Sequence, residues 1–311
     1  MSGFDPQWLA QREPFDLAAR SSKLERRFAH FLQQRTRSAT TPYRLLDLGG
    51  GTAANFRALA PRLDVDQRWL LCDHDLTLLA SIPHSLTQWS QAHGWRCHTT
   101  ADSVVVWAGS RRWSLETRSI NLAIDLESID ATQWDGVTTT AFLDLVSKAW
   151  LERLVDWIDA ASVPFLATLT VEGRRQWTPE LQADIDIHES FRQHQTGDKG
   201  FGPSLGPSAA QSLEQLFGQR GVCCETDASD WRIGAQSTHM LRRMADESAA
   251  IAIASQPSSR QELEAWLQER KQLIAGGCAS LTIGHLDLLA YPRSLCTAEL
   301  DADSQPHPSS T

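Results

Sequence analysis

The sequence predicts an α/β protein whose central sheet is mostly parallel. Between residues 44 and 171, apolar segments of strand length alternate with segments whose apolar residues recur at helical spacing. The first strand, Arg44–Leu48, runs into a glycine-rich turn and then into a helix over Ala53–Arg62. Because strand–helix alternation wraps a parallel sheet in helices on both faces, we expect a ligand site beyond the carboxyl ends of the strands.

The remaining elements follow in the order that such a sheet requires. A second strand is expected at Arg68–Cys72, and a hairpin at Ser103–Leu115 precedes a third strand, Ile120–Ile124, which ends at Asp125. Further strands are expected at Gly136–Phe142, Pro164–Val171, Val222–Thr226 and Leu281–Ala290, and further helices at Pro6–Gln34, Ser147–Ala160, Trp177–Gln195, Ser208–Arg220, Thr238–Ala254 and Gln261–Ala275.

The composition is that of a globular protein, and the charge favours a small-molecule partner over a nucleic acid. Hydrophobic residues make up 41% of the 311 residues and charged residues 22%, enough to bury a sizeable core. The net charge of −9 argues against a surface that tracks phosphates, and therefore against a nucleic acid as partner. The cysteines show no zinc spacing, no stretch is long enough to span a membrane, and no signal peptide is evident. We therefore expect a cytoplasmic protein without a metal site or a membrane partner.

A carboxylate lies just ahead of the glycine-rich turn. The segment reads Asp47-Leu48-Gly49-Gly50-Gly51-Thr52-Ala53, so Asp47 stands at the strand end, ahead of all three glycines. Glycines let the backbone turn sharply and let a bulky ligand approach the main chain. The pattern Gly49-x-Gly51-x-x-Ala54 also satisfies the relaxed dinucleotide fingerprint. A carboxylate at Asp47, however, would repel a pyrophosphate and attract the ammonium group of a bound methionine moiety.

A second carboxylate, Asp73, follows the second strand. It comes after Gly51 at about the 20-residue spacing at which an acidic side chain accepts hydrogen bonds from the hydroxyls of a ribose. Both NAD and S-adenosylmethionine contain such a ribose, so Asp73 predicts a nucleoside ligand without choosing between them. The alternative is that Asp73 caps the helix that begins near Leu76.

The glycine turn resembles motif I of the class I S-adenosylmethionine-dependent methyltransferases, Asp/Glu-x-Gly-x-Gly-x-Gly, with Ala53 at the third glycine. The resemblance covers about residues 44–171 and the closing strand. It implies a Rossmann-like, seven-stranded, mostly parallel sheet with an antiparallel last strand, and S-adenosyl-L-methionine as cofactor. The family's chemistry is in-line displacement at the sulfonium methyl, in which the enzyme mainly holds the reactants in line and excludes water.

The resemblance and the motif spacing together divide the chain into five parts. Residues 1–43 would form an N-terminal helical cap, ending in a polar linker at Thr36–Pro42, and residues 44–172 the cofactor-binding core. Residues 173–235 would carry a lid or insertion and the sixth strand, and residues 236–296 a helical insertion and the closing strand. Residues 297–311 lack apolar periodicity and are expected to be a disordered tail.

Several cofactor contacts are implied by the resemblance. A carboxylate after the third strand, here Asp125, would meet the exocyclic amine of adenine, and its neighbour Leu126 would offer an N–H group. Arg20, on an N-terminal helix, would pair with the methionine carboxylate; the alternative is a solvated ladder of Arg12, Asp16 and Arg20. The full set assigned to the cofactor is Arg20, Asp47, Gly49, Gly50, Gly51, Thr52, Asp73, His74, Asp125, Leu126, Thr140 and Ala141.

The acceptor side is less well marked in the sequence. Asp144, after the fourth strand, is the candidate for an acceptor-facing base or amine anchor, and the alternative is that it caps the next helix. The loop Phe191–Pro203 joins polar side chains to many glycines, which suits either a substrate lid or a compact turn. The residues assigned to the acceptor are His194, Asp198, Lys199 and Trp177.

Three functions are compatible with these residues. Methyl transfer to a small-molecule acceptor agrees best with the acidic composition and with the absence of an Asn/Asp-Pro-Pro-aromatic motif after the fourth strand. A nicotinamide-dependent oxidoreductase would use the same glycine loop. A non-catalytic protein that binds S-adenosylmethionine or a partner would keep Asp47 and Asp73 but lack an acceptor pocket.

Overall fold

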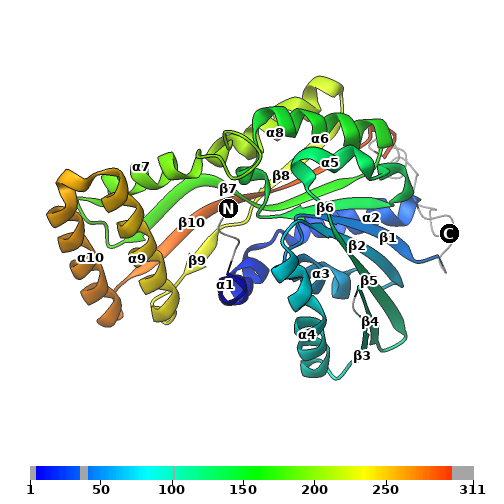
Figure 1. Cartoon of the computed structure of the whole chain (residues 1–311), viewed down its shortest axis with the longest axis horizontal. Coiled ribbons are helices and arrows are strands. Elements are labelled where there is room, and N and C mark those ends of the chain that lie inside the picture. Colours follow the sequence, from blue (N-terminus) through cyan, green and yellow to red (C-terminus); the bar gives the residue numbers. More distant parts are fainter. Residues whose placement is uncertain (1–4, 36–40, 101, 296–311) are drawn as a thin grey trace, which may run out of the picture.

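The computed structural model describes residues 5–35, 41–100 and 102–295. A single ten-stranded sheet runs through the molecule and carries helices on both faces (Figure 1). The predicted tail, Thr297–Thr311, and most of the predicted linker, Thr36–Pro42, lie outside the described residues.

The sheet has the parallel centre and the antiparallel closing strand that the sequence predicts. Its strand order is β3-β4-β5-β2-β1-β6-β7-β10-β8, with β9 paired to β10. Strands β5, β2, β1, β6 and β7 run parallel, and β10 runs antiparallel between β7 and β8. The predicted fold class is therefore confirmed, with ten strands in place of seven. The strands are β1 Tyr43–Leu48, β2 Gln67–Asp73, β3 Arg96–Thr99, β4 Ser103–Ala108, β5 Arg111–Ser119, β6 Gly136–Thr140, β7 Phe165–Thr178, β8 Cys223–Ala228, β9 Trp231–Ile233 and β10 Ser280–Tyr291.

Two apolar cores hold the helices against the two faces of the sheet. Helices α5, α6 and α8 supply Leu122, Leu151 and Leu213 to one core, and α2, α3 and α4 pack on the other core. Figure 1 shows these two layers on either side of the sheet. The helices are α1 Pro6–Ala19, α2 Ser22–Arg35, α3 Ala54–Leu59, α4 Leu76–Ala92, α5 Leu122–Asp125, α6 Lys148–Ala161, α7 Asp184–Gln195, α8 Ala209–Arg220, α9 Thr238–Ser255 and α10 Arg260–Ala275.

The third parallel strand differs from the prediction. It is β5, which starts after the turn at Gly109 and pairs with β2 as far as Asp73 and Ser119. The predicted strand Ile120–Ile124 is wrong, because Asn121 caps the short helix α5 with its side chain. Leu122 and Leu126 are buried whereas Ile124 between them is 69% exposed, which fits a helix and not the alternation of a strand. Asp125 consequently lies within α5 and does not end a strand.

Strands β7 and β10 extend beyond the rest of the sheet as a two-stranded ribbon. The pairing of β7 with β6 ends at Thr168, whereas β7 itself continues to Thr178. The predicted helix over Trp177–Gln195 therefore begins later, as α7 at Asp184. Helices α7, α9 and α10 cover this ribbon around a third apolar core, which Figure 1 shows at the left. Because β7 points past the carboxyl edge of the sheet, this insertion stands beside the expected ligand site.

Helix α1 lies between the sheet and this insertion (Figure 1). The carboxylate of Glu13 accepts two hydrogen bonds from Arg57 on α3, each 2.6 Å long. On the other side, the ring of Phe15 lies 5.9 Å from that of Trp231 on β9. The predicted N-terminal cap therefore covers the edge of the sheet where β1 ends.

Candidate functional site

The turn after β1 is held in place by the neighbouring strand. The N–H groups of Gly49 and Gly50 both donate to the carbonyl oxygen of Cys72 on β2, at 2.9 and 3.3 Å. Gly49 and Gly51 have φ values of +66° and +52°, in the left-handed region that favours glycine, and Ala53 also has a positive φ of 65°. A residue with a Cβ can occupy this region at a cost, so Ala53 at the third glycine position keeps the turn of the motif.

Gly50 and Gly51 are constrained in different ways. A Cβ on Gly50 would lie 2.4 Å from Cγ of Leu71 and 2.7 Å from Oδ2 of Asp47, so these side chains would have to move to admit it. A Cβ on Gly51 would meet nothing closer than 3.8 Å, from Leu78 and from Leu9 on α1. The turn is therefore tightly packed at Gly50, against Leu71 and Asp47. At Gly51 it has open space, on the side that α1 covers.

Alanine substitutions at these two glycines are expected to differ in stability. Gly50→Ala should lower the free energy of unfolding by about 1–3 kcal/mol, because Leu71 and Asp47 must move. Gly51→Ala should cost about 1 kcal/mol, from its positive φ alone. Urea denaturation of both variants measures the difference. An equal loss at the two positions would contradict the packing described here.

Asp47 is a fully buried carboxylate with one free oxygen. Its Oδ1 accepts hydrogen bonds from the side chains of Asn55, at 2.7 Å, and Thr138, at 2.9 Å. Its Oδ2 is buried and has no hydrogen-bond partner among the described residues. Burial raises the pKa of Asp47 to about 6, against the lowering effect of these hydrogen bonds and of the nearby Arg20. An oxygen of this kind is suited to receive a cationic ligand.

Arg20 reaches the same corner from the end of α1. Its Nε donates to Glu25 at 2.5 Å, its Nη2 to Asn55 at 2.9 Å, and its Nη1 to Thr140 at 3.3 Å. Burial lowers the pKa of Arg20, and the charges of Asp287, Asp47 and Asp16 oppose this shift. The alternative of a solvated ladder is wrong for Arg20, because this side chain is buried; Arg12 and Asp16 alone pair, at 3.0 Å.

Asp73 ends β2 and reaches over the glycine turn. Its Oδ2 accepts the N–H of Gly51 at 2.9 Å, and its Oδ1 accepts the N–H of Asp75 at 2.9 Å. Helix α4 is capped by Asp75, so the alternative that Asp73 is the helix cap is wrong. Each oxygen of a carboxylate can accept a further hydrogen bond, so Asp73 retains the capacity to bind a pair of hydroxyl groups.

The other predicted cofactor residues lie at different depths around this turn. Thr52 is buried and its carbonyl oxygen accepts a hydrogen bond from Arg57 at 2.7 Å. His74 is exposed, with Nδ1 3.5 Å from Asp73. Asp125 is exposed on α5, whereas Leu126 is fully buried in the core below it.

The strand-end position predicted for Asp125 is occupied by Asn121. It is the second residue after β5, and the N–H of the intervening Ile120 donates to the carbonyl oxygen of Asp73 at 2.9 Å. Two large apolar side chains are exposed on the helices that follow β2 and β5: Leu76 is 67% and Ile124 69% exposed. The sequence contained a signal for the cap at Asn121, since a polar residue at such a point can begin a helix as readily as it can end a strand.

Beyond Thr140 the chain makes a sharp turn at the end of β6. The hydroxyl of Thr140 lies 2.8 Å from that of Thr168 on β7, and Ala141 has a positive φ of 50°. The ring of Phe142 then packs under Gly49, whose added Cβ would lie 2.6 Å from it. A strained residue at such a point is frequent in functional sites.

Asp144 follows in a short 3-10 turn, Leu143–Leu145. It does not cap the next helix, because the hydroxyl of Ser147 accepts the N–H of Trp150 and begins α6. The Oδ1 atom of Asp144 is buried and has no hydrogen-bond partner among the described residues. Burial raises the pKa of Asp144 to about 6, opposed by a backbone hydrogen bond and by the charge of Arg12.

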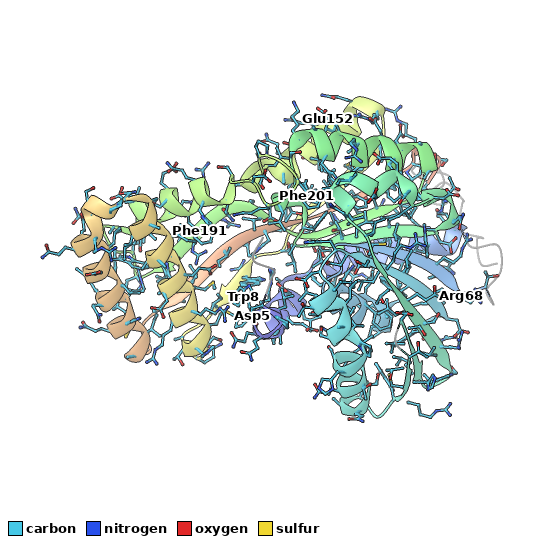
Figure 2. The ribbon with its side chains drawn as sticks, viewed as in Figure 1. Asp5, Trp8, Arg68, Glu152, Phe191 and Phe201 are labelled. Carbon is cyan, nitrogen blue, oxygen red and sulfur yellow. The ribbon has the colours of Figure 1, made fainter. Side chains whose placement is uncertain are left out.

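Asp144 borders a cavity of about 150 Å³ between the sheet and the insertion. Its aromatic walls include Trp8 of α1 and Phe191 of α7, both labelled in Figure 2, and Trp231 of β9. Polar groups from α1, β7, α7, α9 and β10 complete the lining, which contains Arg12, Arg174, Arg175, His188, Arg192, Gln195, Glu247 and His285. This cavity combines flat apolar walls with several unpaired polar atoms, as ligand sites do.

The predicted acceptor residues lie outside this cavity lining. His194 borders a different pocket, of about 560 Å³, between α7 and α9. The carboxylate of Asp198 accepts the N–H groups of Gly200 and Gly202, at 2.7 and 3.1 Å, as in a compact turn. Lys199 reaches only the carbonyl oxygen of His194, at 3.5 Å. Trp177 is buried against Trp266 in the core of the insertion.

Helical spacing explains which residues of α7 reach the cavity. His188, Phe191, Arg192 and Gln195 all line it, and they stand at positions i, i+3, i+4 and i+7 of one helical face. His194 therefore faces away. The glycine-rich loop after α7 packs against the residues that follow β6. The ring of Phe201 lies 5.3 Å from that of Phe142, and the N–H of Leu205 donates to the carbonyl oxygen of Val146 at 2.8 Å.

The described part of the chain contains no cluster of three or more His, Cys, Asp or Glu side chains that could hold a metal ion. Within those same residues, no helix is both long and apolar enough to cross a membrane.

Comparisons with known proteins find only distant likenesses. No family model and no curated protein matches the chain. A cyclopropane synthase from Mycobacterium tuberculosis is 11% identical, with a TM-score of 0.42, over 89% of this chain and 93% of that one. A putative sarcosine dimethylglycine methyltransferase from Galdieria sulphuraria is 12% identical, with a TM-score of 0.37, over 88% and 92%.

A third structure is a geranyl diphosphate C-methyltransferase from Streptomyces coelicolor, solved with geranyl diphosphate and S-adenosylhomocysteine. It is 10% identical, with a TM-score of 0.38, over 86% of this chain and 78% of that one. At such identities and scores the likenesses carry no argument about function. Any proposal about the function of this chain therefore rests on its own strand order and on the residues at the ends of β1, β2 and β6.

Proposed function

We propose that this protein transfers the methyl group of S-adenosylmethionine to a small-molecule acceptor. The observation that carries the proposal is the free Oδ2 of Asp47, buried beside the glycine turn without a partner among the described residues. A buried carboxylate oxygen left unpaired is costly unless a ligand's positive charge meets it. The ammonium group of the methionine moiety is such a charge.

The residues around the turn fit the remaining parts of this cofactor. Arg20 would pair with the methionine carboxylate, since its guanidinium already lies at the corner formed by Asn55 and Thr140. Asp73 would accept hydrogen bonds from the ribose hydroxyls. Leu76 and Ile124, both exposed, would contact the faces of adenine, and Asn121 would stand at its polar edge in place of Asp125.

The chemistry would take place where the glycine turn meets the cavity beside Asp144. When bound, S-adenosylmethionine supplies an electrophilic methyl group on a good leaving group. The cavity walls would hold the acceptor in line and exclude water, which supplies most of the rate enhancement that such a reaction needs. Asp144 would orient the nucleophile or accept its proton, and a pKa of about 6 leaves it ionised at neutral pH.

The two alternative functions are less well supported by the same residues. A pyrophosphate at the glycine turn would stand beside the buried Asp47, which disfavours a nicotinamide dinucleotide. A protein that only binds S-adenosylmethionine would have no use for a polar cavity at the end of β6, yet Asp144 borders one.

Calorimetric titration separates these functions. We expect S-adenosylhomocysteine to bind the purified protein with a Kd in the micromolar range and NADH to show no saturable binding. NADH binding without binding of S-adenosylhomocysteine would overturn the proposal. Incubation with labelled cofactor and a metabolite extract then identifies the acceptor as the compound that acquires the label.

A further inference from the structure

The cavity beside Asp144 contains one arginine whose charge is not matched by an ion pair. Arg12 pairs with Asp16 at 3.0 Å, and Arg174 pairs with Asp230 at 2.6 Å. Arg192 approaches Glu189 at 4.0 Å. For Arg175 no carboxylate lies within ion-pair distance among the described residues.

The guanidinium of Arg175 is nevertheless fixed in position. It stacks over the ring of Phe191, 4.3 Å from the ring centre, and its Nη2 donates to the carbonyl oxygen of Met244 at 3.3 Å. Its Nε is buried and has no hydrogen-bond partner in the described part of the chain. Burial lowers the pKa of Arg175 to about 10, so the group remains charged at neutral pH. Glu247, whose side chain is exposed, opposes this shift from the rim of the cavity.

A second unpaired donor or acceptor stands in the same lining. Nδ1 of His188, one helical turn before Phe191, is buried and has no partner among the described residues. Burial lowers the pKa of His188, and the charges of Arg192 and Arg175 lower it further, against a hydrogen bond with the backbone of Arg175 and the charge of Glu189. The imidazole is therefore neutral at pH 7, and its one N–H group is used by the backbone of Arg175, so that the other ring nitrogen is an acceptor.

We infer that the methyl acceptor is a small monocarboxylic acid, whose carboxylate binds Arg175 while its nucleophile faces Asp144. This inference rests on the proposed function and names the substrate class of the same site. A single unmatched cation suits a monoanion better than a dianionic phosphate, and a guanidinium edge with a free Nε–H binds carboxylates well.

The dimensions of the cavity limit the body of the acid. A volume of about 150 Å³ is close to that of a cavity that holds one benzene ring. Trp8, Phe191 and Trp231 contribute flat apolar walls to the same cavity that Arg175 and Asp144 line. The acceptor is therefore a compact acid with a flat or apolar body, and not a long-chain lipid or a nucleotide.

Binding of model acids tests this inference without knowledge of the acceptor. The probes are benzoate, the neutral benzamide and the dianionic phenyl phosphate, titrated by calorimetry with and without S-adenosylhomocysteine. We expect wild-type protein to bind benzoate at least tenfold more tightly than benzamide. Arg175→Gln should weaken benzoate binding at least tenfold and leave benzamide within twofold, and Arg175→Lys should restore part of the preference. Arg242→Gln, at an exposed position on α9, is the matched control and should change nothing.

Each other result counts against the inference. Equal binding of benzoate and benzamide, binding of neither, tighter binding of phenyl phosphate, or an unchanged preference in Arg175→Gln would overturn it. Thermal melting shows whether Arg175→Gln is folded, and Arg175→Lys gives the same test with the charge retained. If S-adenosylhomocysteine binds and the benzoate preference is absent, only this inference fails. If benzoate shows the preference and S-adenosylhomocysteine does not bind, only the proposed function fails.

Discussion

Asp47→Asn is expected to weaken binding of S-adenosylhomocysteine by roughly 100-fold or more, because it removes the charge that would meet the ligand's ammonium group. Breaking a buried ion pair by neutralising one partner costs about 3 kcal/mol or more. Asparagine keeps an oxygen for the hydrogen bonds from Asn55 and Thr138, so the turn should keep its shape. Calorimetric titration measures the loss.

The pH dependence of the same binding follows from the raised pKa of Asp47. In the free protein this pKa is about 6, and a bound ammonium group would lower it. Binding should therefore release a proton near pH 6, and the affinity of the wild type should fall as the pH drops below 6. Titration in buffers of different ionisation enthalpy measures the released proton. In Asp47→Asn this pH dependence should be absent.

Stability should respond to the same ionisation with a defined sign. The pKa of Asp47 is higher in the folded protein than its ordinary value of 3.8, so ionisation costs the folded state up to about 3 kcal/mol. That cost is absent below pH 3.8 and complete above pH 6. Relative to wild type, Asp47→Asn should thus gain stability as the pH rises from 4 to 7.

A carboxylate at the opposite edge of the sheet provides the control. Asp135 is buried and accepts hydrogen bonds from Arg44 at the start of β1, including one of 3.1 Å from Nη2. Asp135→Asn should lower stability and leave the affinity for S-adenosylhomocysteine unchanged. Equal affinity in wild type and Asp47→Asn would show that Asp47 does not contact the cofactor.

The arrangement of Asp47, the glycine turn and Asp73 could be predicted from the sequence because its parts are local. Asp47 and the glycines belong to one strand–turn–helix unit, and Asp73 ends the adjacent strand, where the parallel register brings it to Gly51. Strand alternation and turn chemistry, which are properties of short segments, are sufficient to place such residues. Asn55 could be identified in the same way, as a polar residue in the first turn of α3, but its role as partner of Asp47 and Arg20 depends on tertiary contacts.

The third strand was misplaced because two local signals competed. The apolar run Ile120–Ile124 resembles a strand, but Asn121 caps a helix there and the hairpin partner β5 continues to Ser119. Short apolar runs do not distinguish a strand from a buried helical turn. The assignment of Asp125 to the adenine edge depended on that strand.

The cavity beside Asp144 could not be predicted from the sequence, for a different reason. Its walls come from α1, β7, α7, α9 and β10, which are distant in the sequence and meet only because β7 and β10 extend past the sheet. The polar composition of the loop Phe191–Pro203 favours a ligand contact there. The residues that line the cavity lie instead on one face of α7. Only Asp144 could be predicted, because it lies four residues after the end of the parallel strand β6.

Asp144→Asn is expected to slow methyl transfer by roughly 10²–10⁴-fold, the usual contribution of a positioned general base. The affinity for S-adenosylhomocysteine should stay within about twofold of wild type, since Asp144 borders the acceptor cavity and not the glycine turn. Transfer of label from the cofactor into the acceptor found in the extract measures the rate. Isothermal titration of the same variant measures the cofactor affinity.

The pH profile distinguishes a base from a residue that only shapes the cavity. With a pKa of about 6 in the free protein, a basic Asp144 makes kcat/KM rise about tenfold per pH unit below pH 6 and level off above it. Because Asp47 titrates in the same range, the profile must be recorded with the cofactor saturating, so that only the acceptor's binding and reaction vary. In Asp144→Asn the low rate should then be independent of pH between 5 and 8. A variant that loses the rate but keeps the wild-type profile would assign Asp144 to orientation of the acceptor, and a variant with the wild-type rate would remove it from the reaction.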